Sequence, residues 1–296
     1  MKRPILILLI TAFSMVSYAQ IETTGGDTQI YHFDNTPDCV SEGFIRFSNR
    51  TTGKVGLMNA SGDIVIPAEY SSLSRVQNGL IYALKGATKI VSDDGEHHDW
   101  EGGQVLLIDI NNQILIMDFT YEYALNFYSL SISNRPDPDS LRHSFKAVDG
   151  QYYSFIDFKK EFKVWLISDL LPDLSRENLL RIAHPKITYW NDGEGWVSEN
   201  QIGFIDRNYE RMLAELMGVK NQTSRFNLFL GGLNPLIYES DDFKKYYNDC
   251  GEAQDWRYPV QSVVITRQSE GEMQQDQFDF LRTDEGYKII SVTLSP

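Results

Sequence analysis

The sequence lacks the short motifs by which several classes of enzyme are identified. It contains no Gly-x-Ser-x-Gly nucleophile elbow, no P-loop and no Gly-x-Gly-x-x-Gly dinucleotide fingerprint. These absences do not exclude a glycosidase, because glycosidase carboxylates carry no local signature. They do count against the enzyme classes that these motifs mark. We therefore favour a non-catalytic protein, and we predict no catalytic residue and no cofactor.

Residues that could bind a metal are also scarce. Of the five histidines only His97 and His98 are neighbours, inside the acidic segment 93–99. Adjacent side chains do not point at one centre, and no CxxC or Cys/His spacing typical of zinc occurs. We expect a solvent-exposed loop here and no metal site.

Only two cysteines are present, Cys39 and Cys250. In an oxidising compartment they could form a disulfide that closes a very long loop and ties the two ends of the protein together. The alternative is two separate buried thiols, and the sequence does not decide between them.

Only one long apolar run occurs, and it lies at the N-terminus. Residues 1–19 combine a basic start, an apolar run from Ile5 to Met15 and small residues before Gln20. The run is too short for a membrane anchor, which needs about 20 apolar residues. We predict a signal peptide cleaved after about Ala19, no membrane span, and a periplasmic or secreted mature protein.

Positive charge is scarce as well. The chain carries a net charge of −14, and removal of Lys2 and Arg3 leaves 25 basic residues against 41 acidic ones, a net charge near −16. Such a surface repels phosphate backbones, so we exclude nucleic acid as a partner. The 296 residues suggest two domains.

The first part of the chain is internally similar. Residues 42–47 reappear as 78–83, and strand-like segments joined by polar turns lie between and after them, at 54–59, 64–70, 105–109 and 114–116. Short strands joined by polar turns indicate β-hairpins. We expect a β-rich module over residues 20–120, with about 14 residues inserted around 92–103.

This pattern resembles the WG-repeat family over residues 40–117. The matching positions are Gly56, Leu57, Asn59, Gly62, Val65, Ile66, Pro67 and Tyr70, with Gly79-Leu80 closing the unit. Val55 stands where the family has its tryptophan. The resemblance implies a bacterial β-repeat protein that acts by interaction rather than catalysis, and it names no partner.

After a connector at 121–150, residues 151–296 show helical spacing and then alternation. Apolar residues recur every three or four positions in 155–166, and further helices are expected at 175–182, 206–217 and 241–248. Strands are expected at 260–267, 278–282 and 287–294. We therefore predict an α+β fold: a β-hairpin repeat module followed by a helix-then-antiparallel-sheet domain.

The last hairpin, 278–290, resembles the closing hairpin of NTF2-like (cystatin-like) domains. That resemblance implies a concave pocket between helices and sheet. Five aromatic residues are candidates for its lining, although we favour plain core for each of them: Phe158, Phe162, Trp165, Phe278 and Phe280.

Three aromatic residues are candidate contacts for a ligand or partner: Tyr70, Trp190 and Trp196. The two tryptophans flank a glycine-rich turn and would suit a sugar face or an apolar patch. The alternative is a tight turn with both rings packed in the core.

These observations predict an exported, non-catalytic binding protein that recognises a protein or cell-envelope component through its β-repeat surface. The alternative function is a small-molecule or hydrolytic pocket in the C-terminal domain.

Overall fold

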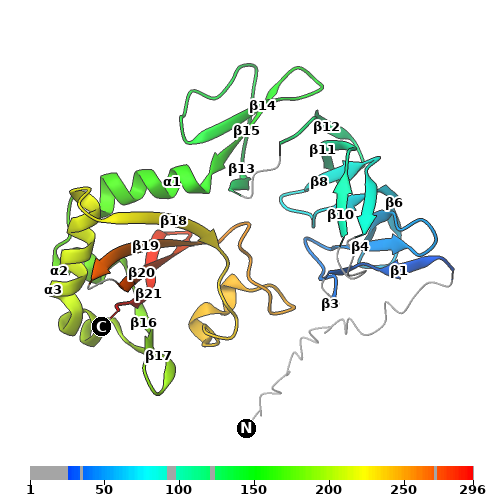
Figure 1. Cartoon of the computed structure of the whole chain (residues 1–296). Helices are drawn as coiled ribbons and strands as arrows, with labels where there is room; N and C mark the ends of the chain where they lie inside the picture. Colours follow the sequence, from blue (N-terminus) through cyan, green and yellow to red (C-terminus); the bar gives the residue numbers. More distant parts are fainter. Residues whose placement is uncertain (1–25, 34–35, 92–97, 121–123, 270–271, 296) are drawn as a thin grey trace, which may run out of the picture.

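The computed structural model describes residues 26–33, 36–91, 98–120, 124–269 and 272–295. Of these residues 48% lie in strands and 18% in helices. Figure 1 shows the strands of the first 120 residues in one lobe and a larger sheet with its helices in a second lobe. The predicted signal peptide lies outside the described residues.

The N-terminal lobe contains two four-stranded antiparallel sheets, with orders β1-β4-β5-β6 and β12-β11-β8-β7. Each hairpin strand predicted from the sequence is present. The bounds are Thr28–Ile30 (β1), Phe44–Asn49 (β4), Val55–Asn59 (β5), Ile64–Tyr70 (β6), Ser72–Leu73 (β7), Leu80–Lys85 (β8), Gln104–Asp109 (β11) and Ile114–Met117 (β12). Two shorter strands, His32–Phe33 (β2) and Thr36–Pro37 (β3), pair with each other.

Two tight turns in this lobe have the same backbone conformation. Glu42 and Gly43 have φ of 52° and 84°, and Asn78 and Gly79 have φ of 54° and 69°. Positive φ at both central residues is the hairpin turn that matches strand twist. The Glu42 carboxylate accepts hydrogen bonds from the backbone N–H groups of Asn78 (2.6 Å) and Gly79 (2.8 Å), so the first turn binds the second.

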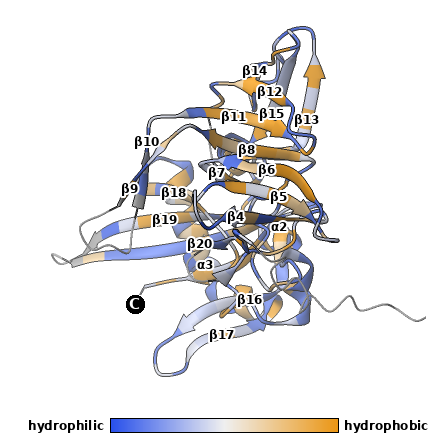
Figure 2. Ribbon diagram, turned by 90° about the vertical axis from the view of Figure 1, so that its right-hand side faces the viewer, coloured by the Kyte–Doolittle hydropathy of each residue, from blue (hydrophilic) through white to orange (hydrophobic). Residues whose placement is uncertain are grey.

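The two sheets share one core. Figure 2 shows hydrophobic residues concentrated on β5, β6, β8 and β11. The buried members are Val55, Leu57, Ile66, Tyr70, Leu73, Val76, Ile81, Ala83, Leu106 and Ile108. Alternate residues of each strand face this core, as the period of two requires.

At Gly56 the backbone of β5 lies very close to the Ile66 carbonyl group and to the Phe47 ring. A Cβ at this position would lie 2.5 Å from the Ile66 carbonyl oxygen and 2.6 Å from the Phe47 ring. We expect Gly56→Ala to destabilise the protein by about 1–3 kcal/mol, the usual cost of overpacking, as measured by urea unfolding. Gly231→Ala, where a Cβ meets nothing within 4 Å, is the control. Equal midpoints for the two variants would contradict the packing argument.

The inserted segment between β8 and β11 forms a two-stranded ribbon. Its strands are Thr88–Val91 (β9) and His98–Glu101 (β10). The predicted loop therefore has regular pairing at its base, and His97 lies outside the described residues.

Residues predicted to be a connector form part of a third sheet, of order β13-β15-β14. Its strands are Leu125–Ser133 (β13), Arg142–Lys146 (β14) and Tyr152–Asp157 (β15). Phe127 and Phe155 of this sheet pack with Phe119, Leu80 and Leu107 in one cluster. The third sheet thus packs on the face of β8 and β11 that is turned away from the core described above.

The C-terminal lobe is a six-stranded sheet of order β17-β16-β21-β20-β19-β18, in which β16 runs parallel to β21. Its strands are Ala183–Asn191 (β16), Gly195–Asn200 (β17), Arg225–Gly231 (β18), Val260–Ser269 (β19), Glu272–Thr283 (β20) and Gly286–Thr293 (β21). Helices Phe158–Trp165 (α1), Arg176–Ile182 (α2) and Gln201–Lys220 (α3) contribute to one core with this sheet. No helix in the described ranges is long and apolar enough to cross a membrane.

The predicted α+β fold with helices before an antiparallel sheet is wrong: the protein is mainly β. Strands β16 and β17 precede α3, and β18 follows it. The sequence pattern missed β17 because this edge strand has no buried residue, so its side chains show no apolar alternation. The antiparallel backbone pairing with β16 holds β17 in the sheet.

The other face of the C-terminal sheet is covered by the segment between β18 and β19, which contains the 3₁₀ helix Asp241–Tyr246 (η3). Phe280 faces the helices, and its neighbour Leu281 packs with Phe243 and Tyr246 of this segment. Successive residues of a strand point to opposite faces. The sheet is therefore buried on both sides.

This covering segment joins the two lobes. A disulfide connects Cys39 to Cys250, with their Cα atoms 6.2 Å apart. Two steps further along the chain, Glu252 forms a bidentate ion pair with Arg75 of the N-terminal lobe. The structure thus contains the disulfide alternative rather than two separate thiols.

Candidate functional site

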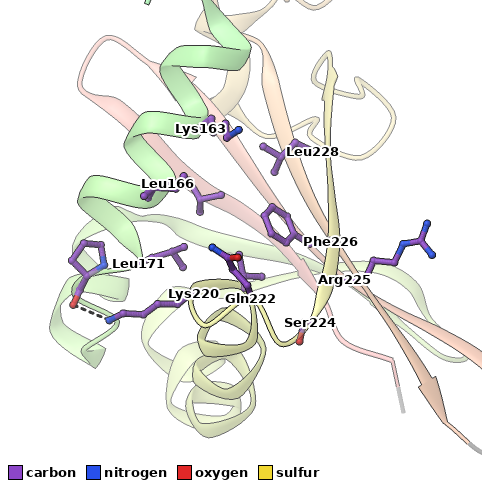
Figure 3. A pocket seen from close by; sticks show the side chains of 12 residues that line it. Lys163, Leu166, Leu171, Lys220, Gln222, Ser224, Arg225, Phe226 and Leu228 are labelled. Carbon is purple, nitrogen blue, oxygen red and sulfur yellow. Dashed lines mark hydrogen bonds between the residues drawn. The ribbon is translucent and has the colours of Figure 1, made fainter.

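A groove opens on the C-terminal lobe between α1, the end of α3 and the edge strand β18 (Figure 3). Its volume is about 750 Å³, within the range of small-molecule sites. The lining residues are Lys163, Leu166, Ile167, Leu171, Pro172, Val219, Lys220, Gln222, Ser224, Arg225, Phe226 and Leu228.

Two chain reversals build the walls of the groove. On one side α1, capped by the Asp157 carboxylate, continues into the wider π-helical turn Leu166–Leu170 (η2) and stops before Pro172. On the other side α3 ends at Lys220, and Gln222, with φ of 56°, turns the chain into β18. Because β18 is an edge strand, no further strand covers this side of the sheet.

The floor of the groove is apolar. Leu166, Leu171 and Val219 are buried, and Phe226 and Leu228 point from β18 toward the helices. Ile167 is 55% exposed although its side chain is fully hydrocarbon. A ligand that covers these residues would remove apolar surface from water, which contributes about 25 cal/mol per Å².

The charged groups of the lining are all cationic: Lys163, Lys220 and Arg225. The Lys220 ammonium lies 3.5 Å from the Pro172 carbonyl oxygen, and the Arg225 guanidinium points away from the groove (Figure 3). Within the part of the chain that the structure describes, no Asp, Glu or His is part of the lining. In a chain of net charge −14 this lining favours an anionic head group.

Carboxyl groups suited to acid–base chemistry lie outside the groove. Burial raises the pKa of Glu215, whose carboxylate is 3.1 Å from Arg267. Burial also raises the pKa of Asp279, which accepts a hydrogen bond from Ser262 at 2.5 Å. Neither of these two carboxyl groups lines the groove, so neither can act on a ligand bound there.

The aromatic residues suggested as pocket lining form the interior between helices and sheet. Phe162 is fully buried and packs on Trp165 (5.6 Å between ring centroids) and Phe280 (5.4 Å). Phe158 and Phe278 are also fully buried. None of these five residues is part of the groove lining.

The two candidate tryptophans lie at the tip of the β16–β17 hairpin. Trp190 and Trp196 are cross-strand partners with ring centroids 5.6 Å apart, and they are 51% and 45% exposed. The alternative that both rings pack in the core is therefore wrong. The Trp190 indole donates to Asp192 at 3.2 Å, and neither ring borders the groove.

Tyr70, the third candidate contact, is only 1% exposed. Its hydroxyl donates to the Asn112 side chain at 2.5 Å, and the Lys85 ammonium lies 5.0 Å from its ring. Burial, with a smaller effect from Glu69, raises the pKa of Tyr70 to about 12. Tyr70 belongs to the core of the N-terminal lobe and offers no ring to a partner.

Sequence reasoning did not find the groove residues. In β18, Phe226 and Leu228 alternate with Arg225 and Asn227, a strand signal that the exposed Phe229 then interrupts. Nothing in the sequence relates Lys163 to Lys220, which folding brings to one groove. Scans against protein-family models, curated proteins and solved structures found no match to this chain.

Proposed function

We propose that this chain is an exported, non-catalytic binding protein whose C-terminal groove holds an amphipathic anion, an acyl chain with a carboxylate head. The observation that carries the proposal is the combination of an apolar floor with lysines and no carboxylate in the lining. A hydrocarbon chain would cover Leu166, Phe226 and Leu228, and its head group would meet Lys163 or Lys220.

Two features support export of the protein. The N-terminal 19 residues have the pattern of a signal peptide, and the Cys39–Cys250 disulfide suits an oxidising compartment. We propose a periplasmic or secreted location on these grounds.

We also propose that the C-terminal lobe is NTF2-like. Its support is the order β17-β16-β21-β20-β19-β18, in which β16 and β21 are parallel, with helices on one face. The hairpins of the N-terminal lobe support the WG-like proposal in the same way, through the placement of their strands. Neither proposal is needed for the groove to bind a ligand.

A chain-length series tests the groove. By isothermal titration, we expect octanoate, decanoate and dodecanoate, each below its micelle concentration, to bind progressively tighter. Each buried CH₂ contributes about 0.8 kcal/mol, or roughly fourfold in Kd. An affinity that does not depend on chain length would refute the proposal.

Charge is tested with the double variant Lys163→Gln/Lys220→Gln. We expect dodecanoate to bind about tenfold more weakly, because two cations together contribute about 1–2 kcal/mol at an exposed site. Dodecanol should bind this variant and the parent equally. The control variant Lys146→Gln/Lys244→Gln removes two exposed lysines elsewhere and should leave both affinities unchanged. An equal loss for dodecanol would show that the lysines act through packing rather than charge.

A further inference from the structure

A second groove, in the N-terminal lobe, has a different character. It lies between β1, the β4–β5 turn and the β9–β10 ribbon, and its volume is about 390 Å³. Its lining is mostly polar: Gln29, Tyr31, His32, Ser48, Asn49, Arg50, Thr52, Gly53, Lys54, Val55, Ser71, Ala87, Lys89 and Trp100. Since it belongs to the other lobe, it is independent of the acyl groove.

The β4–β5 turn holds part of this lining rigidly. The Asn49 side chain accepts hydrogen bonds from the backbone N–H groups of Thr51 (3.0 Å) and Thr52 (2.8 Å). Gly53, with φ of 67°, then donates to the Asn49 carbonyl oxygen at 2.8 Å. The turn therefore places Arg50 and Lys54 at the groove without help from a ligand.

A buried hydroxyl fixes one of the cations. The Lys54 ammonium donates to the Ser71 hydroxyl at 3.0 Å, and Ser71, 1% exposed, donates to the Ala87 carbonyl oxygen at 3.1 Å. By contrast, Lys85 on the neighbouring strand pairs with the Glu69 carboxylate at 3.0 Å. Lys54 is held by a neutral group and keeps its charge available.

Three cations of this groove have no carboxylate partner in the described part of the chain: Arg50, Lys54 and Lys89. Lys89 lies directly opposite Trp100 in the ribbon, so a cation and an indole ring border the groove together. Among the described residues no Asp or Glu belongs to the lining, although acidic residues outnumber basic ones by 41 to 27 in the whole chain. The groove therefore concentrates positive charge on an acidic protein.

We propose that this groove binds a carboxylated oligosaccharide. Amide and hydroxyl groups such as Gln29, Ser48 and Thr52 match the hydroxyls of a sugar, and the three cations match its carboxylates. The Trp100 ring supplies the aromatic surface on which sugar faces commonly pack. An inorganic anion would meet the cations but would leave most of the 390 Å³ unfilled.

Isothermal titration with trigalacturonate tests the proposal. We expect binding to the full-length mature protein and no measurable binding of its trimethyl ester, which keeps the hydroxyls and lacks the charge. Lys54→Gln/Lys89→Gln should weaken binding at least tenfold, because a hydrogen bond to a charged group contributes enough for about a factor of ten. The variant's melting temperature, compared with that of the parent, reports whether the fold is retained.

The variant Ser71→Ala distinguishes the position of the Lys54 ammonium from its charge. It keeps every cation but removes the group that holds Lys54, so we expect a smaller loss than in the double variant. Equal binding of the ester and the acid would overturn the proposal. Tighter binding of hexa-aspartate than of trigalacturonate would overturn it in favour of an acidic peptide, and an unchanged affinity in Lys54→Gln/Lys89→Gln would place the saccharide elsewhere.

Discussion

Reduction of the Cys39–Cys250 disulfide is expected to lower the melting temperature by about 10 °C. The bond closes a loop with a sequence separation of 211. In the chain-entropy account, cross-linking so long a loop removes about 5 kcal/mol of conformational freedom from the unfolded state. At roughly 2 °C per kcal/mol for a chain of this size, the shift is easily measured by differential scanning calorimetry.

The double variant Cys39→Ser/Cys250→Ser provides the matched control. It should melt at the temperature of the reduced parent, and dithiothreitol should have no further effect on it. If the parent melts at the same temperature with and without reductant, the bond does not restrict the unfolded chain as proposed.

The second large effect is expected from Asp38, beside the disulfide. Its carboxylate is fully buried and accepts hydrogen bonds from Arg46 (Nε, 2.9 Å; Nη2, 2.7 Å) and from Arg75 (Nε, 2.9 Å). Asp38→Asn retains the shape but leaves two guanidinium groups without their shared anion. We expect it to cost roughly 3–5 kcal/mol, as for other broken buried ion pairs.

Urea unfolding can compare the free energy of unfolding lost in Asp38→Asn with that lost in Asp242→Asn. Asp242 forms an ion pair with Lys186 in which both side chains are about half exposed, so its loss should cost less than about 1 kcal/mol. Similar costs for the two variants would mean that the Asp38 network is not strongly coupled.

Protonation of Asp38 at low pH should also weaken its network with Arg46 and Arg75. Burial raises the pKa of Asp38, but the hydrogen bonds and charges of Arg46 and Arg75 outweigh it and hold that pKa below its usual value. A carboxyl whose folded pKa is lowered stabilises the protein above about pH 4, and this contribution is lost as the pH falls through the folded pKa. The acid limb of stability should therefore be shallower in Asp38→Asn.

The sequence predicted the β-rich N-terminal lobe well because local signals are strong there. Gly43 and Gly79 adopt the positive φ that a tight hairpin turn needs, and apolar residues alternate in the strands that follow these turns. In the C-terminal lobe the helix predicted at 175–182 is confirmed as α2, which Ser175 caps. The helix predicted at 206–217 begins earlier, because Asn200 caps α3, and Asp206 pairs with Arg176 instead.

The candidate sites were harder to predict, for two physical reasons. Each groove is lined by residues from segments distant in the chain, such as Lys163 with Phe226 and Lys54 with Trp100. In the sequence their lysines and arginines look like any other surface residues. What distinguishes them is that no carboxylate of the described chain is among the residues that line the grooves. Trp190 and Trp196 were conspicuous in the sequence, yet neither borders a groove described above.

The two equivalent turns of the N-terminal lobe use different side-chain groups to contact their neighbours. At the first turn Glu42 presents an acceptor, and the backbone donors of Asn78 and Gly79 meet it. At the second turn the same position is Asn78, whose amide donates to the Phe127 carbonyl oxygen of β13. Glu42 also accepts a hydrogen bond from the Tyr128 hydroxyl of β13 at 2.7 Å, so both turns are tied to each other and to the same strand. These directional bonds orient the third sheet against the hairpins, which apolar packing alone would not do.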